Sequence, residues 1–410
     1  MTFAVTLGDY LYVEGGQIST LVDKKLTNDA ESLEFSKTLA IPLNKPWKPG
    51  SVEIKEIAYK KDMRATNFAG LWADPKRNAI YRWAGELSRS ARYEEGQENE
   101  MYMLSVDGSG DGTWSIKKPA QQAAFDNISP STHGQSVFCD DLGFYIGGYV
   151  YSGSSYGESN RGSPGVRMYN ASSSEWSNIT DFDLSGPQGN LRNGAAVCVK
   201  GFGSSPLVML LGGAQSFESE HQPLSSVTIY NPITQKWYRQ DTVKDTNGFP
   251  SEREYFCAAA AQGKNGTLEV YMFGGLSTKK RALDDFWVLS LPAFKWFQLS
   301  SAQSPDAIRH GHKCVIAGNR QFISIGGLAK YRGGGFKSDD VWPRGIGIFD
   351  LVTSAWVDSY DPGLGEYDSP ANVQEIYKNG EADGYNYTPV IQDLFWKNRS
   401  SNRNRSSNSR

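Results

Sequence analysis

A pair of glycines closes an apolar stretch again and again along this chain. The pairs end at Gly16, Gly148, Gly213, Gly275 and Gly327, and an altered copy reads Ala84–Gly85. Two glycines at the end of a strand permit positive φ angles and allow another backbone to come close, which a Cβ atom would prevent. A mark repeated six times predicts a repeat architecture, in which each copy is one supersecondary unit.

A tryptophan follows each glycine pair, after an apolar residue and a short polar turn. The clearest copies are MYNASSSEW, IYNPITQKW, VLSLPAFKW and IFDLVTSAW, which end at Trp176, Trp237, Trp296 and Trp356. Trp114 closes a copy with a longer turn, and Trp47 closes a degenerate one. Turns rich in Asn, Asp, Ser and Pro join antiparallel strands. We expect the large indole to fill the seam to the next unit.

A strand of small residues precedes each glycine pair, as in LRNGAAVCV before Gly212. Each unit therefore contains four strands, and its first two strands are continuous apolar runs. Such runs are expected when both faces of a sheet are buried. One four-stranded sheet cannot bury both of its faces, whereas six sheets packed side by side in a ring can.

The glycine pairs, the aromatic–Asx turns and the spaced tryptophans together resemble the Kelch repeat of β-propellers. The resemblance implies an all-β fold, a six-bladed Kelch β-propeller over residues 1–362. The blades expected are 1–60, 61–120, 121–185, 186–245, 246–302 and 303–362. The chain also resembles extracellular or cell-surface Kelch-type proteins of fungi, whose central domain is like that of galactose oxidase.

A partly helical extension is expected over residues 363–396, followed by a disordered tail rich in Ser, Asn and Arg over 397–410. SPANVQEIYKNG predicts a helix with Ser369 as N-cap, Val373 and Ile376 on one face, and Gly380 as its stop. TPVIQDLF predicts another short helical turn. Both helices are expected to cover the ring or its closure.

Kelch propellers are mostly binding scaffolds, so the resemblance implies a non-enzymatic protein that presents its loops to a protein or glycan ligand. It implies no cofactor and no metal. One alternative is a copper- or carbohydrate-active propeller enzyme, and another is a cytosolic Kelch adaptor. His310 and His312 lie two positions apart on one strand and could share a metal. The same positions also suit polar residues that open a blade.

Three arginines are the specific site candidates. Arg192, Arg253 and Arg309 open the first strand of three successive units. The loops that lead into the innermost strands meet at one mouth of a propeller, so three guanidinium groups there predict a ring suited to carboxylates or other anions. The alternative is structural, with each arginine in a salt bridge to a neighbouring blade.

Long insertions join the second and third strands of several units. They are rich in Tyr, Ser and Gly, and we expect them to bind partners from one face of the ring. The insertions are GYVYSGSSYGESNRGSPG, AQSFESEHQPL and LAKYRGGGFKSDDVWPRG.

The four cysteines lie in the first strands of units three to six. They are Cys139, Cys198, Cys257 and Cys314. Small buried core residues are one interpretation. The other is a disulfide between the first strands of adjacent blades, such as Cys257–Cys314, which requires Cα atoms within about 7 Å.

Charge and hydropathy restrict the partners. The net charge of −3 argues against a nucleic-acid partner. No apolar run is long enough to span a bilayer, so membrane attachment is expected only through a segment absent from this chain. Candidate glycosylation sites, defined by Asn-x-Ser/Thr, are Asn170, Asn178, Asn265, Asn386 and Asn398. The resemblance implies an extracellular or cell-surface location, with the cytoplasm as the alternative.

Overall fold

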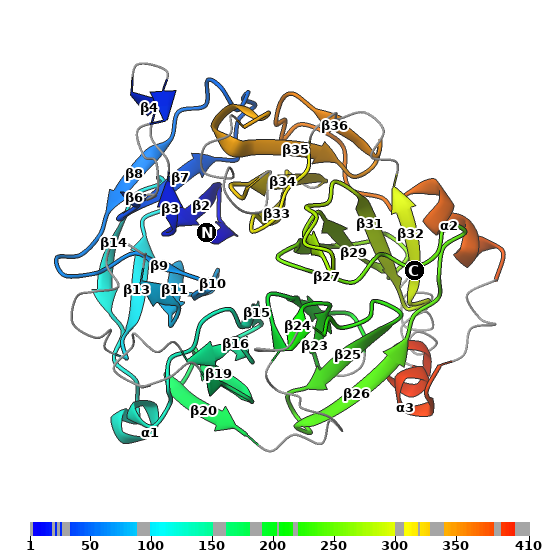
Figure 1. The fold of residues 1–410 in the computed structure, drawn as a ribbon, viewed down its shortest axis with the longest axis horizontal. Coiled ribbons are helices and arrows are strands. Elements are labelled where there is room, and N and C mark those ends of the chain that lie inside the picture. Colours follow the sequence, from blue (N-terminus) through cyan, green and yellow to red (C-terminus); the bar gives the residue numbers. More distant parts are fainter. Residues whose placement is uncertain are drawn as a thin grey trace, which may run out of the picture.

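Six four-stranded antiparallel sheets stand around a central axis like the blades of a propeller (Figure 1). This confirms the predicted fold class. The computed structural model describes residues 3–18, 21–22, 25–26, 33–87, 99–150, 161–180, 191–202, 205–215, 220–299, 307–318, 320–328, 340–380 and 387–397.

Each blade is built from consecutive segments of the chain, with its strands in sequence order from the axis outward. Blades 1 to 3 are β1 (Phe3–Leu7), β2 (Tyr10–Glu14), β7 (Lys37–Pro42) and β8 (Lys55–Ala58); β10 (Gly70–Asp74), β11 (Ala79–Trp83), β13 (Met101–Val106) and β14 (Gly112–Ile116); and β15 (Gln135–Cys139), β16 (Leu142–Ile146), β19 (Val166–Asn170) and β20 (Glu175–Ile179). Blades 4 to 6 are β22 (Ala195–Val199), β23 (Leu207–Leu211), β25 (Ser226–Asn231) and β26 (Lys236–Asp241); β28 (Cys257–Gln262), β29 (Leu268–Phe273), β31 (Phe286–Leu291) and β32 (Lys295–Leu299); and β33 (Lys313–Ala317), β34 (Gln321–Ile325), β35 (Ile346–Asp350) and β36 (Ala355–Val357).

Short ribbons extend the blades beyond the glycine pairs. In blades 2, 4 and 5 they pair the residues before the inner strand with those after the glycines. The ribbons are β3 (Gln17–Ile18) with β6 (Leu33–Glu34), β4 (Leu21–Val22) with β5 (Lys25–Leu26), β9 (Thr66–Asn67) with β12 (Glu86–Leu87), β17 (Tyr149–Val150) with β18 (Arg161–Gly162), β21 (Leu191–Arg192) with β24 (Ala214–Gln215), and β27 (Arg253–Glu254) with β30 (Leu276–Ser277).

The hydrophobic core lies in the seams between neighbouring blades. β29 is buried along its whole length because it packs on both sides. Val270 and Met272 pack against blade 4, whereas Tyr271 and Phe273 pack against blade 6. Alternate side chains of a strand point to opposite faces of its sheet. The continuous apolar runs thus do mark sheets that are covered on both faces.

The glycine pairs dock each blade onto the next one. Both residues of every pair have positive φ, and Ala84 adopts 64° in the altered copy. The second residue donates its N–H to a carbonyl just before the next inner strand, as in Gly148 to Leu191 at 2.8 Å and Gly275 to Arg309 at 2.8 Å. A Cβ atom added to Gly148 would lie 2.3 Å from the Thr132 carbonyl oxygen. Thr132 precedes the inner strand of the same blade, so a side chain at this position would force Gly148 away from its own blade.

The spaced tryptophans fill the seams, but toward the preceding blade. The expectation that Trp296 fills the seam to the next blade is wrong, because its Nε1 donates to the Leu224 carbonyl of blade 4 at 2.8 Å. Trp114 of blade 2 likewise donates to Thr38 of blade 1 at 3.0 Å. All six tryptophans pack against the preceding blade because each occupies the same face of its sheet.

The ring closes by packing, without exchange of strands between the chain ends. Blade 1 comes entirely from the start of the chain and blade 6 from a later segment. At their seam, Trp47 and Tyr360 exchange two backbone hydrogen bonds of 3.0 and 2.8 Å, and their rings stack with centroids 5.0 Å apart. The degenerate first tryptophan therefore serves the closure.

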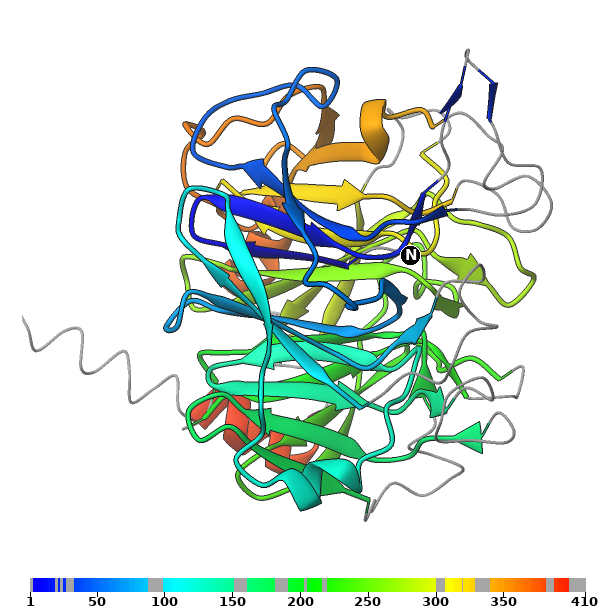
Figure 2. The ribbon, with the colours of Figure 1, turned by 90° about the vertical axis from the view of Figure 1, so that its left-hand side faces the viewer.

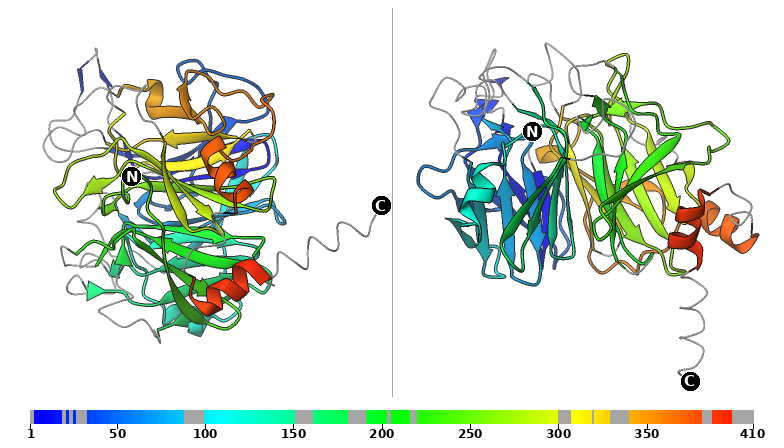
Figure 3. Two further views of the ribbon diagram at one scale, coloured as in Figure 1. Left: turned by 90° about the vertical axis from the view of Figure 1, so that its right-hand side faces the viewer. Right: turned by 90° about the horizontal axis from the view of Figure 1, so that it is seen from below.

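The C-terminal helices cover two other seams at the outer edge of the ring (Figure 3). α2 (Ala371–Lys378) buries Val373 and Ile376 between blades 5 and 6. α3 (Pro389–Gln392) and η4 (Asp393–Lys397) bury Ile391 and Phe395 between blades 4 and 5. The other helices of the described residues are α1 (Gln122–Asp126) and η2 (Pro343–Gly345).

The predicted N-cap of α2 is wrong. Pro370 occupies that position, and the Ser369 hydroxyl instead lies 3.3 Å from the hydroxyl of Thr267 in blade 5. Gly380 follows the helix with φ of 69°, as the predicted stop requires. Residues 398–410, where a disordered tail is predicted, lie outside the described residues.

Candidate functional site

The six inner strands begin at one end of the central channel and end at the other. We call the end where they begin the upper mouth, and the end where the turns after β10, β15 and β22 lie the lower mouth. The connections between second and third strands also reach the upper mouth, because consecutive antiparallel strands alternate in direction. Side views of the ring separate these two faces (Figure 2).

Five blades place a left-handed residue two positions before the inner strand, at the rim of the upper mouth. These residues are Phe68, His133, Asn193, Tyr255 and Gly311, with φ of 58, 63, 57, 60 and 67°. Their backbones are linked in series: Asn193 donates to His133 at 2.9 Å, Tyr255 to Asn193 at 2.8 Å, and Gly311 to Tyr255 at 2.7 Å. We call this set the girdle. Phe and Tyr rarely adopt this conformation, and such strain clusters at functional sites.

Aromatic side chains of the girdle meet above the channel. The rings of Phe68 and His133 stack with centroids 3.5 Å apart, and Tyr255 lies 6.0 Å from Phe68 and 6.2 Å from His133. Tyr149 stacks on His133 at 4.8 Å. Phe68 and Tyr255 are partly exposed, whereas His133 is buried. The upper mouth thus presents a rigid, partly exposed aromatic surface.

The girdle could not be recognised in the sequence, because aligning the blades by their similar residues does not bring its members to the same position. Aligning RNG in blade 4 with RHG in blade 6 matches Asn193 with His310, whereas the structure matches it with Gly311. Asn and Gly at this position are the available signal, since both tolerate left-handed angles. Phe, His and Tyr in the other blades hide that signal.

Two of the predicted arginines are buried inside their own blades. Arg253 is 0% exposed and Arg309 is 2% exposed. Arg253 donates to the Gly274 carbonyl at 3.0 Å and to both carboxylate oxygens of Asp285 at 2.5 and 2.7 Å. Arg309 forms the equivalent bonds to the Gly326 carbonyl and to Asp340. Each guanidinium therefore ties the glycine pair to the segment that leads into the third strand.

The third arginine is not equivalent to these two. Arg192 lies one position closer to its inner strand, and its Nη1 donates to Glu254 of blade 5 at 2.8 Å. Glu254 also accepts from Lys280 at 2.6 Å and from Asn193 at 3.1 Å. Burial would raise the pKa of Glu254, but Lys280 and Arg192 hold it below its usual value. Binding of an external anion by the three arginines stays a prediction, and all three already hold carboxylates of this chain.

The two histidines of blade 6 are buried. His312 is 1% exposed and packs edge-on against Phe273 with centroids 5.3 Å apart. Burial lowers the pKa of His312 well below its usual value, so the imidazole is neutral. The backbone of His310 pairs with Leu328 beyond the glycine pair. Among the described residues, no three His, Cys, Asp or Glu side chains come together as a metal site.

A cavity of about 440 Å³ occupies the channel beneath the girdle. All six inner strands contribute to its wall, which presents both polar and apolar groups. Small side chains such as Ala4, Ala196 and Ala258 keep it open. Lys313, the first residue of β33, also lines it.

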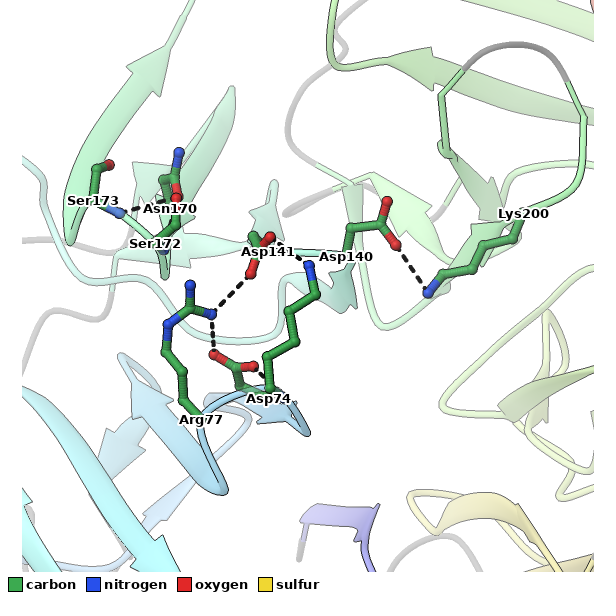
Figure 4. Close-up of polar contacts among 9 residues, drawn as sticks. Asp74, Arg77, Asp140, Asp141, Asn170, Ser172, Ser173 and Lys200 are labelled. Carbon is green, nitrogen blue, oxygen red and sulfur yellow. Dashed lines mark hydrogen bonds and ion pairs between the residues drawn. The ribbon is translucent and has the colours of Figure 1, made fainter.

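Salt bridges connect blades 2, 3 and 4 at the lower mouth (Figure 4). Nη1 of Arg77 lies 2.6 Å from Asp74 in its own turn and 2.8 Å from Asp141 in blade 3. Nζ of Lys200 in blade 4 lies 3.1 Å from Asp140. The side chains of Lys200 and Asp140 are exposed, whereas those of Arg77 and Asp141 are partly buried and that of Asp74 is buried. Only part of this rim is therefore solvated.

The Asx residue of the repeat caps the turn between the third and fourth strands on the same lower face. The Asn170 side-chain oxygen accepts from the backbone N–H of Ser172 at 2.9 Å, and Asn231 and Asp350 form the same bond to the residue two positions later. Asx residues stabilise turns in this way. The aromatic–Asx pair thus has a structural role.

Two disulfides link inner strands of adjacent blades. Cys257 and Cys314 join blades 5 and 6 near the upper mouth, and Cys139 and Cys198 join blades 3 and 4 near the lower mouth. The disulfide interpretation, with Cys257–Cys314 as its example, is therefore confirmed, and Cys139 and Cys257 are buried in the core as well. Cys257 begins its strand and Cys139 ends its strand, which explains why the four cysteines share no common register.

The predicted glycosylation sites differ in accessibility. Asn178 and Asn265 are exposed, on an outer strand and in a turn respectively. Asn170 is partly buried in the turn that it caps. Asn386 and Asn398 lie outside the described residues. So do residues 151–160, 216–219 and 329–339, which hold most of the predicted binding insertions.

Comparisons with known proteins agree with this architecture. A family model described as the KLHDC2/KLHL20/DRC7 Kelch-repeats domain matches residues 208–363. A Kelch repeat-containing protein of Arthroderma benhamiae is 28% identical over 231 residues, which are 54% of this chain and 33% of that protein. The Rab9 effector protein with kelch motifs of Homo sapiens is 30% identical over 124 residues, 30% of either chain.

The matches are partial. The Tip elongation aberrant protein 1 of Schizosaccharomyces pombe is 35% identical over 66 residues, 16% of this chain and 6% of that protein. The chain thus spans a third or less of the length of these relatives. The family match, the six blades, and the glycine pairs and tryptophans that join them show that the chain is a Kelch-repeat β-propeller.

Proposed function

We propose that this chain is a non-enzymatic scaffold that binds a protein partner at its upper mouth. The Kelch-repeat family supports a role in protein interaction. The observation that carries the proposal is the aromatic girdle, in which Phe68 and Tyr255 are partly exposed on a fixed backbone. Aromatic side chains are enriched at the energetic centres of protein interfaces. Rigid anchors also lose little conformational entropy on binding.

The lower mouth is the weaker candidate for the interface. Its turns are short and capped, and its charges pair with one another. Ile233 is its prominent apolar side chain, 74% exposed in the turn between β25 and β26. This residue provides a matched control on the opposite face.

The test compares three proteins as baits in extracts of the native host. Phe68→Asn/Tyr255→Asn removes both aromatic rings and substitutes the residue that blade 4 carries at the same girdle position. Because Asn tolerates left-handed angles, the backbone strain should not increase. We expect quantitative mass spectrometry to show a partner retained by the wild type and by Ile233→Ala but lost by the double variant. A partner lost only on Ile233→Ala would overturn the proposal.

We further propose that the protein works in an oxidising compartment, outside the cell or at its surface. Disulfides persist mainly in such compartments, and the four cysteines form two of them. Exposed Asn178 and Asn265 could carry glycans there. Among the described residues, no helix has the length and apolar character of a membrane span.

A cytosolic adaptor is the second candidate, favoured by the similarity to the Rab9 effector protein with kelch motifs. Thiol labelling decides between the two. Protein from the native host is denatured in maleimide without reductant, then analysed by mass spectrometry. An oxidising compartment predicts no labelled cysteine, whereas labelling of all four would favour the cytosolic adaptor.

A further inference from the structure

One cation in the channel differs from every arginine of the upper mouth. Lys313 lines the cavity, and its Nζ lies 5.6 Å from the centre of the Phe3 ring. Within the described parts of the chain, no carboxylate forms a salt bridge with it. Arg192, Arg253 and Arg309 each hold one. A partly buried charge without a counter-ion is stabilised when a ligand supplies one.

Apolar side chains form part of the wall around Lys313. Phe3, Val5, Leu71, Phe138, Ala258 and Ile316 line the same cavity. Its volume of about 440 Å³ lies in the range of small-molecule sites. The Ser136 hydroxyl accepts from Trp72 Nε1 at 2.9 Å, so its own proton can be donated toward a ligand.

We propose that the central channel binds a small organic anion, whose single carboxylate pairs with the Lys313 ammonium and whose apolar body lies against the inner strands. A second carboxylate would have no counter-ion in this wall, and a neutral ligand would leave the ammonium uncompensated. This site lies beneath the girdle, whose Phe68 and Tyr255 border it, and its charge comes from Lys313, which the proposed protein interface does not use.

Burial lowers the pKa of Lys313 to about 8. Below that value the side chain is an ammonium and binds the carboxylate; above it the side chain is neutral and the attraction is lost. The other titratable side chains along this wall are His133, Tyr255 and His312. Burial lowers the pKa of His312 and raises that of Tyr255, so neither changes charge in mildly alkaline solution.

Calorimetric titration with hexanoate, benzoate and the neutral analogue hexanamide tests the proposal on the disulfide-intact protein. We expect one molecule of either acid to bind per chain near neutral pH, with hexanamide bound about tenfold more weakly or worse. Lys313→Met removes the charge but keeps the length of the side chain, and should remove this preference. Lys236→Met, on an exposed outer strand, is the control and should bind like the wild type.

A pH series on the wild type keeps the test independent of the variant's folding. Both acids stay ionised above about pH 6, so affinity that falls between about pH 7 and pH 9 reports Lys313. A pH dependence that survives in Lys313→Met would belong to another group and would count against the proposal. So would equal affinity for hexanoate and hexanamide, or failure of both acids to bind at millimolar concentration.

Discussion

The pairs Arg253–Asp285 and Arg309–Asp340 at the upper mouth differ in burial from the pair Lys200–Asp140 at the lower mouth. At the upper mouth Arg253 and Arg309 are buried, and each is paired with a carboxylate of the same blade. At the lower mouth Lys200 and Asp140 are paired while their side chains remain 56% and 50% exposed. A buried pair that loses one partner leaves an unsatisfied charge, whereas an exposed pair is replaced by water. The two upper pairs are therefore structural, whereas the Lys200–Asp140 pair of the lower mouth is superficial.

The length of the connections explains this difference. β19 and β20 are joined by residues 171–174, a turn that its own Asn170 caps. β29 and β31 are joined by residues 274–285, and such a connection has no single cap. The Arg253–Asp285 pair fixes both of its ends. The face with long connections thus needs buried charges, and the same connections supply the surface proposed for binding.

Removing the disulfides should have the largest effect, of similar size at both mouths. The bridges span 57 and 59 residues of sequence. Loop-closure entropy depends on that span and not on the mouth, so Cys257→Ala/Cys314→Ala and Cys139→Ala/Cys198→Ala should each lower the free energy of unfolding by about 4 kcal/mol. Denaturant titration of both double variants measures the loss. A large difference between them would show that one mouth has greater residual strain or flexibility than chain entropy predicts.

Breaking a buried pair at the upper mouth should follow closely. Arg253→Met leaves Asp285 without its guanidinium and should destabilise the fold by about 3 kcal/mol. Arg253→Met/Asp285→Asn removes the stranded charge and should recover part of that loss. Denaturant titration of the single and double variants measures both values. This account is contradicted if the double variant loses more unfolding free energy than Arg253→Met and Asp285→Asn lose together.

The same pair predicts a dependence on pH. Burial would raise the pKa of Asp285, but Arg253 holds it below its usual value. Because the folded-state pKa is lowered, the stabilisation is present above the unfolded value near pH 4 and is lost as the pH falls through the folded-state value. The stability difference between wild type and Arg253→Met should therefore shrink in acid. If the stability difference between wild type and Arg253→Met stays the same in acid, the charge on Asp285 is not its cause.

The fold could be predicted from the sequence because its marks are local and repeated. Gly148 and Gly275 sit where positive φ and close backbone approach leave no choice of residue, so the pattern survives in every blade. The direction in which Trp296 packs could not be predicted, since it depends on the twist and facing of whole sheets. The pairing of Cys139 with Cys198 likewise depends on which strands adjoin across a seam.

The candidate site was harder to predict because its residues share a backbone conformation and not a side chain. Phe68, Asn193 and Tyr255 have no chemistry in common, yet all three have left-handed φ angles at one rim. Arg192 is the opposite case. It opens its unit as Arg253 does, but it lies one position closer to the inner strand and pairs with a carboxylate of the next blade. Lys313 carries no motif, and only the closed ring shows that it faces a channel.

The smallest effect is expected at the lower mouth and completes the comparison. Lys200→Met removes an exposed partner of Asp140, and the loss in unfolding free energy should stay below about 1 kcal/mol because water solvates the freed carboxylate. Added salt should reduce even this difference, since exposed charges are screened. Denaturant titrations at low and high ionic strength, run beside Arg253→Met, give the measurement. A loss that equals that of Arg253→Met and resists salt would mean that the lower rim also holds the ring together, and the contrast between the two mouths would fail.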